Sequence, residues 1–363
     1  MRSREIMKHN AILITGGAGF VGSSLAVSFK NEYPQLRVIA MDNLKRRGSE
    51  LNLPRLRGYG IEFVHGDIRN PEDFPQMDYS AVIECSAEPS VLAGFGGSPL
   101  YVVNTNLSGT INCLEEARRR KAAVIFISTS RVYPYDRIEE IEIVEEESRF
   151  AWKEGQEIRG WSQRGISEDF SLDGPRSLYG TSKLCSELVL QEYIAMYGIR
   201  SVINRCGVIA GPWQFGKADQ GVFTYWMLSH YFKKGGLKYI GFGGRGKQVR
   251  DLMHVDDLFR LVDRELQDID KLNGRVFNIG GGPEISLSLR ETTNMCEEIT
   301  GNTIEVGSLS VARPADLHIY ITDHARVEEV TGWKPQKSAS QILNDIFLWI
   351  RNNESAIADS FSV

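Results

Sequence analysis

The sequence predicts a doubly wound α/β fold, in which helices cover both faces of a parallel sheet. Short, continuously apolar runs alternate with helix-like segments through the first half of the chain. Such runs are typical of strands that are buried on both faces. A glycine-rich turn also joins the first run directly to the first helix-like segment, as expected where a strand feeds a crossover helix.

The strands and helices expected from this pattern follow one another at intervals that suit crossover connections. Apolar runs predict strands at residues 11–15, 37–41, 61–65, 81–85, 123–127, 201–204 and 276–279. Helical periodicity predicts helices at 23–30, 107–119, 178–196 and 287–298, and one more amphipathic helix in the tail before Ile350.

Two segments interrupt the alternation. Residues 136–147 hold seven acidic side chains and one arginine, and the segment that continues to about Arg176 is polar and rich in tryptophan, serine and glycine. Together they predict a solvated hairpin or loop excursion, with a role in binding as the alternative. Glycine and aromatic residues dominate 212–246, where Gly243, Gly244 and Gly246 indicate tight turns.

Composition excludes several functional classes. Hydrophobic residues make up 42% of the 363 residues and charged residues 25%, which is typical of a soluble globular protein. The net charge of −5 gives no general attraction to nucleic acid, and the sequence has no membrane-length apolar run. From the charged residues that precede the first strand we expect no secretory leader. Five cysteines without a Cys-x-x-Cys pair indicate reduced thiols, and the six histidines lack ligand spacing. We therefore expect a cytoplasmic protein without a metal.

The turn after the first strand predicts a dinucleotide site. Gly16, Gly19 and Gly22 are spaced G-x-x-G-x-x-G between strand and helix, which lets backbone N–H groups approach a pyrophosphate. Asp42 ends the second strand, 20 residues after the last glycine, where a ribose-binding carboxylate is expected. Because a carboxylate repels a 2′-phosphate, Asp42 favours NAD over NADP. Asp67, after the third strand, is a candidate contact for the adenine amino group or a loop-capping residue.

A second pattern predicts proton transfer. Tyr179 and Lys183 are four residues apart at the start of an expected helix, so that their side chains share one face. Lowering a phenol pKa by three units takes about 4 kcal/mol, which Lys183 and a cationic nicotinamide can supply together. Thr129 closes the fifth strand, at the sheet edge where ligands lie, and its hydroxyl can hold a sugar oxygen.

Taken together, these motifs resemble the extended short-chain dehydrogenase/reductases that act on nucleotide sugars, over roughly residues 11–350. The resemblance rests on the glycine triplet, Asp42, Asp67-Ile68, Thr129, the Tyr179/Lys183 pair and the run from Arg250 to Asp257. It implies a Rossmann-like fold, bound NAD and a catalytic set of Thr129, Tyr179 and Lys183. It also implies a cofactor-binding set: Gly16, Gly19, Phe20, Val21, Gly22, Asp42, Asn43, Asp67, Ile68, Ser86, Ala87, Asn104, Tyr179 and Lys183.

The same resemblance implies a nucleotide-sugar site. Arg250 and Arg313 are expected to hold the pyrophosphate, since a guanidinium fork suits paired phosphate oxygens. Gln214, Gln220 and Gln248 are candidate contacts to the sugar or base. Residues 1–210, with returning segments at about 247–278 and 318–330, would form the dinucleotide-binding domain. Residues 211–246 and 279–317 would form the interleaved nucleotide-sugar lobe, and 331–363 the C-terminal helix and tail.

Within the family, the motifs favour a carbon-2 epimerase. Ser130 and Arg131 stand where dehydratases usually carry Asp-Glu, and Val208 stands where 4-epimerases commonly carry Asn. The segments around Asp42, His65 and Gln248 are similar to those of the CDP-paratose 2-epimerases. The expected reaction is inversion of carbon 2 of a CDP-3,6-dideoxyhexose through a keto sugar. The alternatives are a UDP-hexose or UDP-uronate 4-epimerase, an NAD-dependent nucleotide-sugar dehydratase, and a non-catalytic NAD-binding protein. The family also implies a homodimer or homotetramer, formed through the helices at 107–119 and 178–196.

Overall fold

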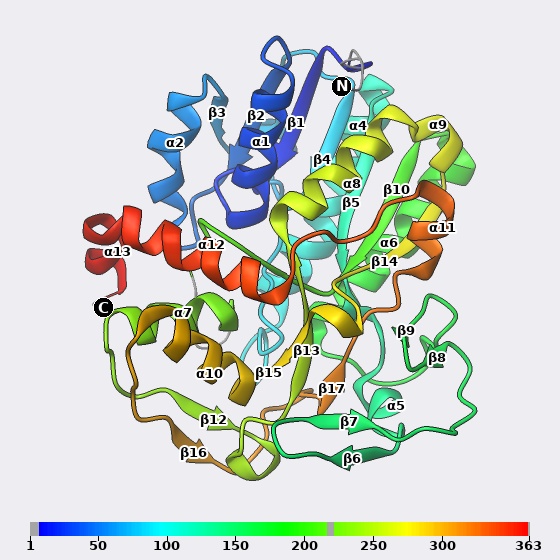
Figure 1. Ribbon diagram of the computed structural model, residues 1–363. Coiled ribbons are helices and arrows are strands. Elements are labelled where there is room, and N and C mark those ends of the chain that lie inside the picture. Colours follow the sequence, from blue (N-terminus) through cyan, green and yellow to red (C-terminus); the bar gives the residue numbers. More distant parts are fainter. Residues whose placement is uncertain (1–6, 216–220, 362–363) are drawn as a thin grey trace.

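A computed structural model describes residues 7–215 and 221–361 of the chain. At its centre lies a seven-stranded parallel sheet with the order β14-β10-β5-β4-β1-β2-β3 (Figure 1). The strands are β1 (Ala11–Thr15), β2 (Arg37–Asp42), β3 (Glu62–His65), β4 (Ala81–Glu84), β5 (Ala123–Thr129), β10 (Ser201–Cys206) and β14 (Arg275–Ile279). The order confirms the predicted doubly wound fold, because successive connections reverse direction between β1 and β4.

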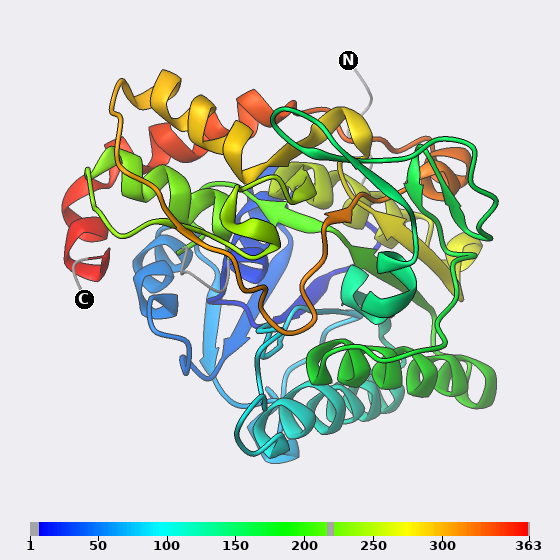
Figure 2. The ribbon, with the colours of Figure 1, turned by 90° about the horizontal axis from the view of Figure 1, so that it is seen from below.

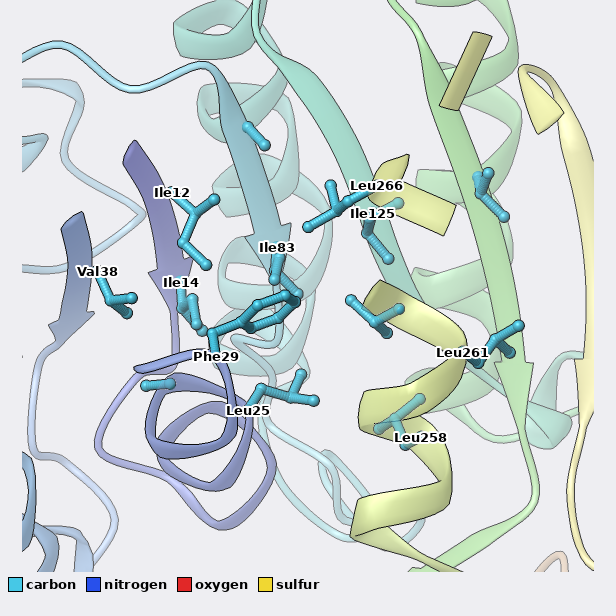
Figure 3. Close-up of a cluster of buried hydrophobic side chains, with 14 of the residues drawn as sticks. Ile12, Ile14, Leu25, Phe29, Val38, Ile83, Ile125, Leu258, Leu261 and Leu266 are labelled. Atoms are coloured by element: carbon cyan, nitrogen blue, oxygen red, sulfur yellow. The ribbon is translucent and has the colours of Figure 1, made fainter. Parts of the chain in front are cut away.

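Successive side chains along each strand point to opposite faces of the sheet and enter two separate hydrophobic cores. Ile12 and Ile14 of β1 pack with Phe29 of α1 (Phe20–Glu32) and with leucines of α8 (Val255–Gln267), as Figure 3 shows. Leu13 points to the opposite face and joins the second core. On that face α4 (Gly109–Arg120) and α6 (Leu178–Tyr197) lie side by side (Figure 2). The sheet is therefore buried on both faces, as its continuous apolar runs predict.

A smaller lobe faces the carboxyl ends of the strands (Figure 1). Its second sheet has the order β11-β13-β15, and β17 also pairs with β13. The strands are β11 (Val208–Ala210), β13 (Val249–His254), β15 (Ser286–Ser288) and β17 (Ile319–Tyr320). A third core joins α7 (Val222–Tyr231), α10 (Leu289–Thr300) and α12 (Ala339–Asn352). A short parallel pair, β12 (Lys238–Ile240) with β16 (Gly307–Leu309), lies at the lobe's edge.

The acidic excursion is docked on the protein as well as facing solvent. It forms α5 (Tyr135–Glu139) and two hairpins, β6 (Ile143–Glu145) with β7 (Phe150–Trp152) and β8 (Trp161–Ser162) with β9 (Gly165–Ile166). Phe150 and Trp152 are buried, and Arg149 forms a 2.6 Å ion pair with Glu291 of α10. The prediction of a hairpin is confirmed, and the aromatic residues explain why it packs on the smaller lobe.

The remaining helices are short. They are α2 (Leu53–Gly58), α3 (Leu100–Val103), α9 (Ile269–Leu272), α11 (Ala325–Thr331) and α13 (Glu354–Phe361). The tail thus holds α11 and α13 beside the one amphipathic helix expected there, α12, and α7 lies in a segment predicted only to turn. Within the part of the chain that the structure describes, no helix is both long and apolar enough to cross a membrane.

Candidate active site

Two glycines of the turn after β1, Gly16 and Gly22, leave no room for a side chain. Gly16 has a φ of +64°, and a Cβ there would lie 2.9 Å from the backbone of Cys85 and Ser86. A Cβ on Gly22 would collide with the carbonyl oxygen of Gly16. The Gly19 N–H donates to that same carbonyl at 3.0 Å. The turn therefore brings bare backbone to the start of α1, where an anionic diphosphate is stabilised.

Asp42 is fixed at the end of β2 by the turn itself. Its Oδ2 accepts from the Ala18 N–H at 3.1 Å, and its Oδ1 accepts from the Leu44 N–H at 2.8 Å. Burial raises the pKa of Asp42, and the backbone N–H groups oppose that rise. Each oxygen has a further lone pair, and the carboxylate lines a cavity of about 420 Å³, so that the arrangement suits ribose hydroxyls.

Most of the other expected cofactor residues line this cavity or its neighbour. Asn43, Ile68, Ser86 and Ala87 line the first cavity with Gly16, Gly19 and Asp42. Phe20, Val21 and Gly22 line a second cavity of about 370 Å³, which shares Gly16 and Gly19 with the first. The two cavities thus adjoin at the glycine turn, with Asp42 on one side and Thr129 and Tyr179 on the other, and the residues present fit a dinucleotide.

Three of the expected cofactor residues, Asp67, Asn104 and Lys183, line neither cavity. The Asp67 carboxylate is held by Arg69 and accepts from Asn43 Nδ2 at 2.9 Å. The bonds from Arg69 outweigh burial and lower the pKa of Asp67 to about 2. Asn104 begins a π-helical turn, Asn104–Ser108, and is exposed. Thr105 lines the cavity from this turn, and no sequence pattern marks the π-helical insertion.

Tyr179 and Thr129 both line the second cavity, and the Thr129 hydroxyl acts to lower the pKa of Tyr179. Ser177 caps the first turn of α6 by accepting from the Gly180 N–H at 3.2 Å, which fixes where the helix and its Tyr179 begin. Burial raises the pKa of Tyr179 to about 12, against the lowering effects of Thr129 and Arg131. The phenol is therefore protonated at neutral pH until a further positive charge is bound nearby.

Lys183 lies one helical turn after Tyr179, and its ammonium is engaged by a residue that the sequence patterns did not single out. Its Nζ lies 3.5 Å from Glu84 Oε2 and 3.9 Å from the centre of the Phe126 ring. Both charged side chains are 1% exposed. The sequence did hold a signal for Glu84, because it is an acidic residue at the end of an otherwise apolar strand. A carboxylate buried in that position needs a charged or hydrogen-bonding partner.

A third cavity, of about 310 Å³, opens toward the smaller lobe. Gln248, Arg250 and Arg313 line it, as expected of substrate-binding residues, and Arg131 lines both this cavity and the second one. Arg250 forms a 2.8 Å ion pair with Asp316. The Gln248 amide donates to the carbonyl of Ile240 at 2.9 Å.

Gln214 lines the second cavity instead of the third, and its amide is engaged within the protein. It donates to the Ile209 carbonyl at 3.1 Å and accepts from Thr224 at 2.8 Å. Gln220, the remaining candidate for substrate binding, lies outside the described residues.

Comparison with known families agrees with this geometry. The model of the NAD dependent epimerase/dehydratase family matches residues 12–280, which include the glycine turn, Asp42, Thr129 and Tyr179. The matched range covers the central sheet and reaches into the smaller lobe.

Individual relatives catalyse different reactions. A CDP-paratose 2-epimerase from Salmonella typhi is 30% identical over 350 residues, which cover 93% of this chain and 98% of the relative. A dTDP-glucose 4,6-dehydratase from Streptomyces niveus is 26% identical, covering 95% of this chain and 94% of the relative. Among solved structures, UDP-glucose 4-epimerase with UDP-glucose from Thermotoga maritima superposes with a TM-score of 0.74 at 25% identity, covering 95% and 99% of the two chains.

Proposed function

The chain belongs to the NAD dependent epimerase/dehydratase family, and from this membership we propose that it inverts carbon 2 of a CDP-linked 3,6-dideoxyhexose. The proposed reaction interconverts CDP-paratose and CDP-tyvelose. The observation that carries an epimerase assignment is that Tyr179 and Thr129 line the same cavity, which shares Arg131 with the substrate cavity. The choice of carbon 2 is supported by the 30% identity to the 2-epimerase.

In the proposed mechanism, the Tyr179 phenolate accepts the proton of the carbon-2 hydroxyl while Thr129 donates a hydrogen bond that orients the same oxygen. NAD, which the glycine turn and Asp42 would hold, would supply the redox chemistry as acceptor and donor of the carbon-2 hydride. Tyr179 then returns the proton to the oxygen. Since cofactor oxidation state and proton count are restored in each turnover, NAD remains bound.

Arg131 disfavours the dehydratase alternative. Elimination of water needs an acid and a base close to the sugar, and the side chain that follows Thr129 by two residues is a guanidinium. Burial and the neighbouring Arg250 lower the pKa of Arg131 to about 10, which still keeps it charged and unable to exchange a proton at neutral pH. A UDP-sugar 4-epimerase remains the second candidate, on the basis of its structural likeness to this chain.

In this proposal the two lobes bind different ligands. Residues 1–210, with the returning segments at about 247–278 and 318–330, bind NAD, and residues 211–246 and 279–317 bind the nucleotide sugar. Leu188 and Met196 of α6 are 53% and 68% exposed, and we propose that α6, together with α4, joins copies of the chain in a homodimer or homotetramer that works in the cytoplasm. The free thiols of all five cysteines suit that compartment.

The test is proton NMR of the purified protein with CDP-paratose in deuterated buffer. Conversion to CDP-tyvelose with protium kept at carbon 2 is the expected result, since the hydride returns internally. Deuterium at carbon 2 would contradict transient oxidation. Without conversion, the 2-epimerase assignment is wrong, and UDP-hexoses and UDP-uronates tested in the same way decide for or against the 4-epimerase.

A further inference from the structure

The third cavity, between the two lobes, is lined by more positive than negative side chains. Its cationic lining residues are Arg131, Lys238, Arg250 and Arg313. Asp316 is the only carboxylate that lines it among the described residues. An excess of one charge around a cavity attracts a ligand of the opposite charge. The cavity is therefore suited to a ligand that carries more than one negative charge.

One tight turn, from Arg313 to Asp316, contacts the guanidinium of Arg131. The Asp316 N–H donates to the Arg313 carbonyl at 3.2 Å and closes the turn. Within it, Ala315 has a φ of +56°, in the left-handed region that a residue with a side chain rarely adopts. The Ala315 carbonyl accepts from Arg131 Nη1 at 3.2 Å. Backbone strain of this kind persists where the surroundings fix it, and it is concentrated at ligand sites.

The same turn holds Arg250, but by a carboxylate. Arg250 Nη2 donates to Asp316 Oδ1 and to the carbonyl of Leu317, both at 2.8 Å. Arg131, in contrast, forms no ion pair within the part of the chain that the structure describes, and the Ala315 carbonyl occupies only one of its several guanidinium donors. The charge of Arg131 and its other donors can therefore serve a ligand in the cavity.

Arg131 also lies where the substrate cavity meets the catalytic one, because it lines both. Its N–H donates to Thr129 Oγ1 at 3.2 Å. Its carbonyl lies against Gly180, where a Cβ would collide with that oxygen. The backbone of Arg131 is therefore fixed on the first turn of α6, which carries Tyr179. An anion bound to Arg131 would lie next to the catalytic cavity.

The position of the phosphate limits which sugar carbon can react. In a nucleoside-diphosphate sugar, the β-phosphate is bonded through oxygen to carbon 1. Carbon 2 is bonded directly to carbon 1, whereas further ring atoms separate carbon 4 from it. An enzyme that oxidises carbon 2 must therefore hold the β-phosphate closer to its proton acceptor than a 4-epimerase does.

We propose that Arg131 binds the β-phosphate of the nucleotide sugar and thereby presents carbon 2, instead of carbon 4, to Tyr179. The proposal rests on the proposed function in taking Tyr179 as the proton acceptor. The fork of N–H donors on a guanidinium suits a pair of phosphate oxygens. Because the turn from Arg313 to Asp316 contacts both Arg131 and Arg250, it sets how far the diphosphate lies from the catalytic residues.

The first experiment compares a nucleoside diphosphate with the monophosphate that lacks the β-phosphate. Calorimetric titration measures the affinities of CDP and CMP for the NAD-loaded enzyme and for its Arg131→Met and Arg131→Lys variants. We expect Arg131→Met to weaken CDP binding by about tenfold or more, since charge-assisted hydrogen bonds are lost, and to leave CMP binding within about twofold. Arg131→Lys keeps the charge and should restore part of the loss.

Arg245→Met is the matched control. Arg245 belongs to the same lobe, but it does not line the cavity, and its Nη2 donates to Glu145 at 2.7 Å. This variant should change neither affinity. Equal losses of CDP and CMP affinity in Arg131→Met, or no loss of either, would overturn the proposal, because Arg131 would then shape the cavity or bind another group, such as a sugar carboxylate.

The second measurement tests the choice of carbon. With CDP-paratose at saturation, Arg131→Met should lower kcat by at least about tenfold as well as raise KM, since the reacting carbon is misplaced. A raised KM with an unchanged kcat would contradict the placement of carbon 2 by Arg131. Inversion of carbon 4 by the wild-type protein would refute the proposed function and the choice of carbon together. Titration with CDP and CMP, or with UDP and UMP, would still decide whether Arg131 binds the β-phosphate.

Discussion

Arg205 and Glu187 form a buried ion pair of 2.7 Å that joins β10 to α6 behind the catalytic residues. The Ser128 hydroxyl donates to the same carboxylate. Because Ser128 directly precedes Thr129, and Glu187 lies one turn beyond Lys183, the carboxylate connects both strand ends to the helix that carries Tyr179.

We predict that Glu187→Gln destabilises the protein by about 3 kcal/mol, since it leaves a buried guanidinium without its charge partner. Urea unfolding followed by circular dichroism measures this loss. Glu62→Gln is the control, because its ion pair with Arg37 is exposed and should contribute far less. Equal losses in both variants would show that burial of the Glu187 pair has no special weight.

The glycine turn gives a second prediction with an internal control. Gly22→Ala places a methyl group against the Gly16 carbonyl, so we expect loss of NAD binding by at least about tenfold or failure to fold. Gly58→Ala meets open space in α2 and should leave NAD affinity unchanged. Calorimetric titration with NAD distinguishes the two. Wild-type affinity in Gly22→Ala would mean that the turn can open.

Part of the fold and part of the candidate site could be predicted from the sequence alone. The strands of the central sheet were predictable, because buried parallel strands are continuously apolar and crossover helices separate them. Asp42 was predictable because both the turn and the strand that fix it lie within one βαβ unit.

Contacts between distant units were not predictable. Glu84 and Lys183 are 99 residues apart, and they meet only because the strand order places β4 next to β5, on which α6 packs. Asn104 is exposed at the start of a π-helical turn, and such a turn leaves no mark in the sequence. The docking of the acidic hairpin likewise depends on two buried aromatic residues, Phe150 and Trp152, among many charges.

Cofactor preference provides the third prediction. Asp42→Ala should weaken NAD binding by about tenfold or more, because two hydrogen bonds from the ribose to a charged acceptor are lost. The same change should narrow the discrimination against NADP, since the repulsion of the 2′-phosphate is removed. The affinities of NAD and NADP are measured for Asp42→Ala and for the comparison variant Asp67→Asn. In the unmodified protein the Asp67 carboxylate faces Arg69 and Asn43. An unchanged ratio of NAD to NADP affinity in Asp42→Ala would contradict the assignment of Asp42.

Glu265 makes stability depend on pH. It is fully buried in α8 and accepts from Asn204 at 2.8 Å, and burial raises its pKa to about 8. The folded-state pKa of Glu265 is above that of the unfolded chain, so the protein is more stable where Glu265 is protonated in both states. The stability associated with the protonated carboxyl is complete below about pH 4.5 and is lost as the pH rises to about 8. Glu265→Gln removes the titration, so that at neutral pH we expect a gain of up to about 3 kcal/mol. Urea unfolding at several pH values compares the two proteins. Parallel stability curves would show that Glu265 is charged in the folded state.

Tyr179→Phe removes the hydroxyl that the proposed mechanism uses as base and acid. General acid–base catalysis is worth about a hundredfold or more, so turnover of CDP-paratose should fall by at least that factor. NAD should stay bound, because the glycine turn and Asp42 are untouched. Tyr193→Phe is the matched control, since Tyr193 lies on the same helix and its hydroxyl bonds Glu115, away from the cavities. A loss of less than about tenfold in Tyr179→Phe, measured by NMR under saturating substrate, would mean that another group accepts the proton.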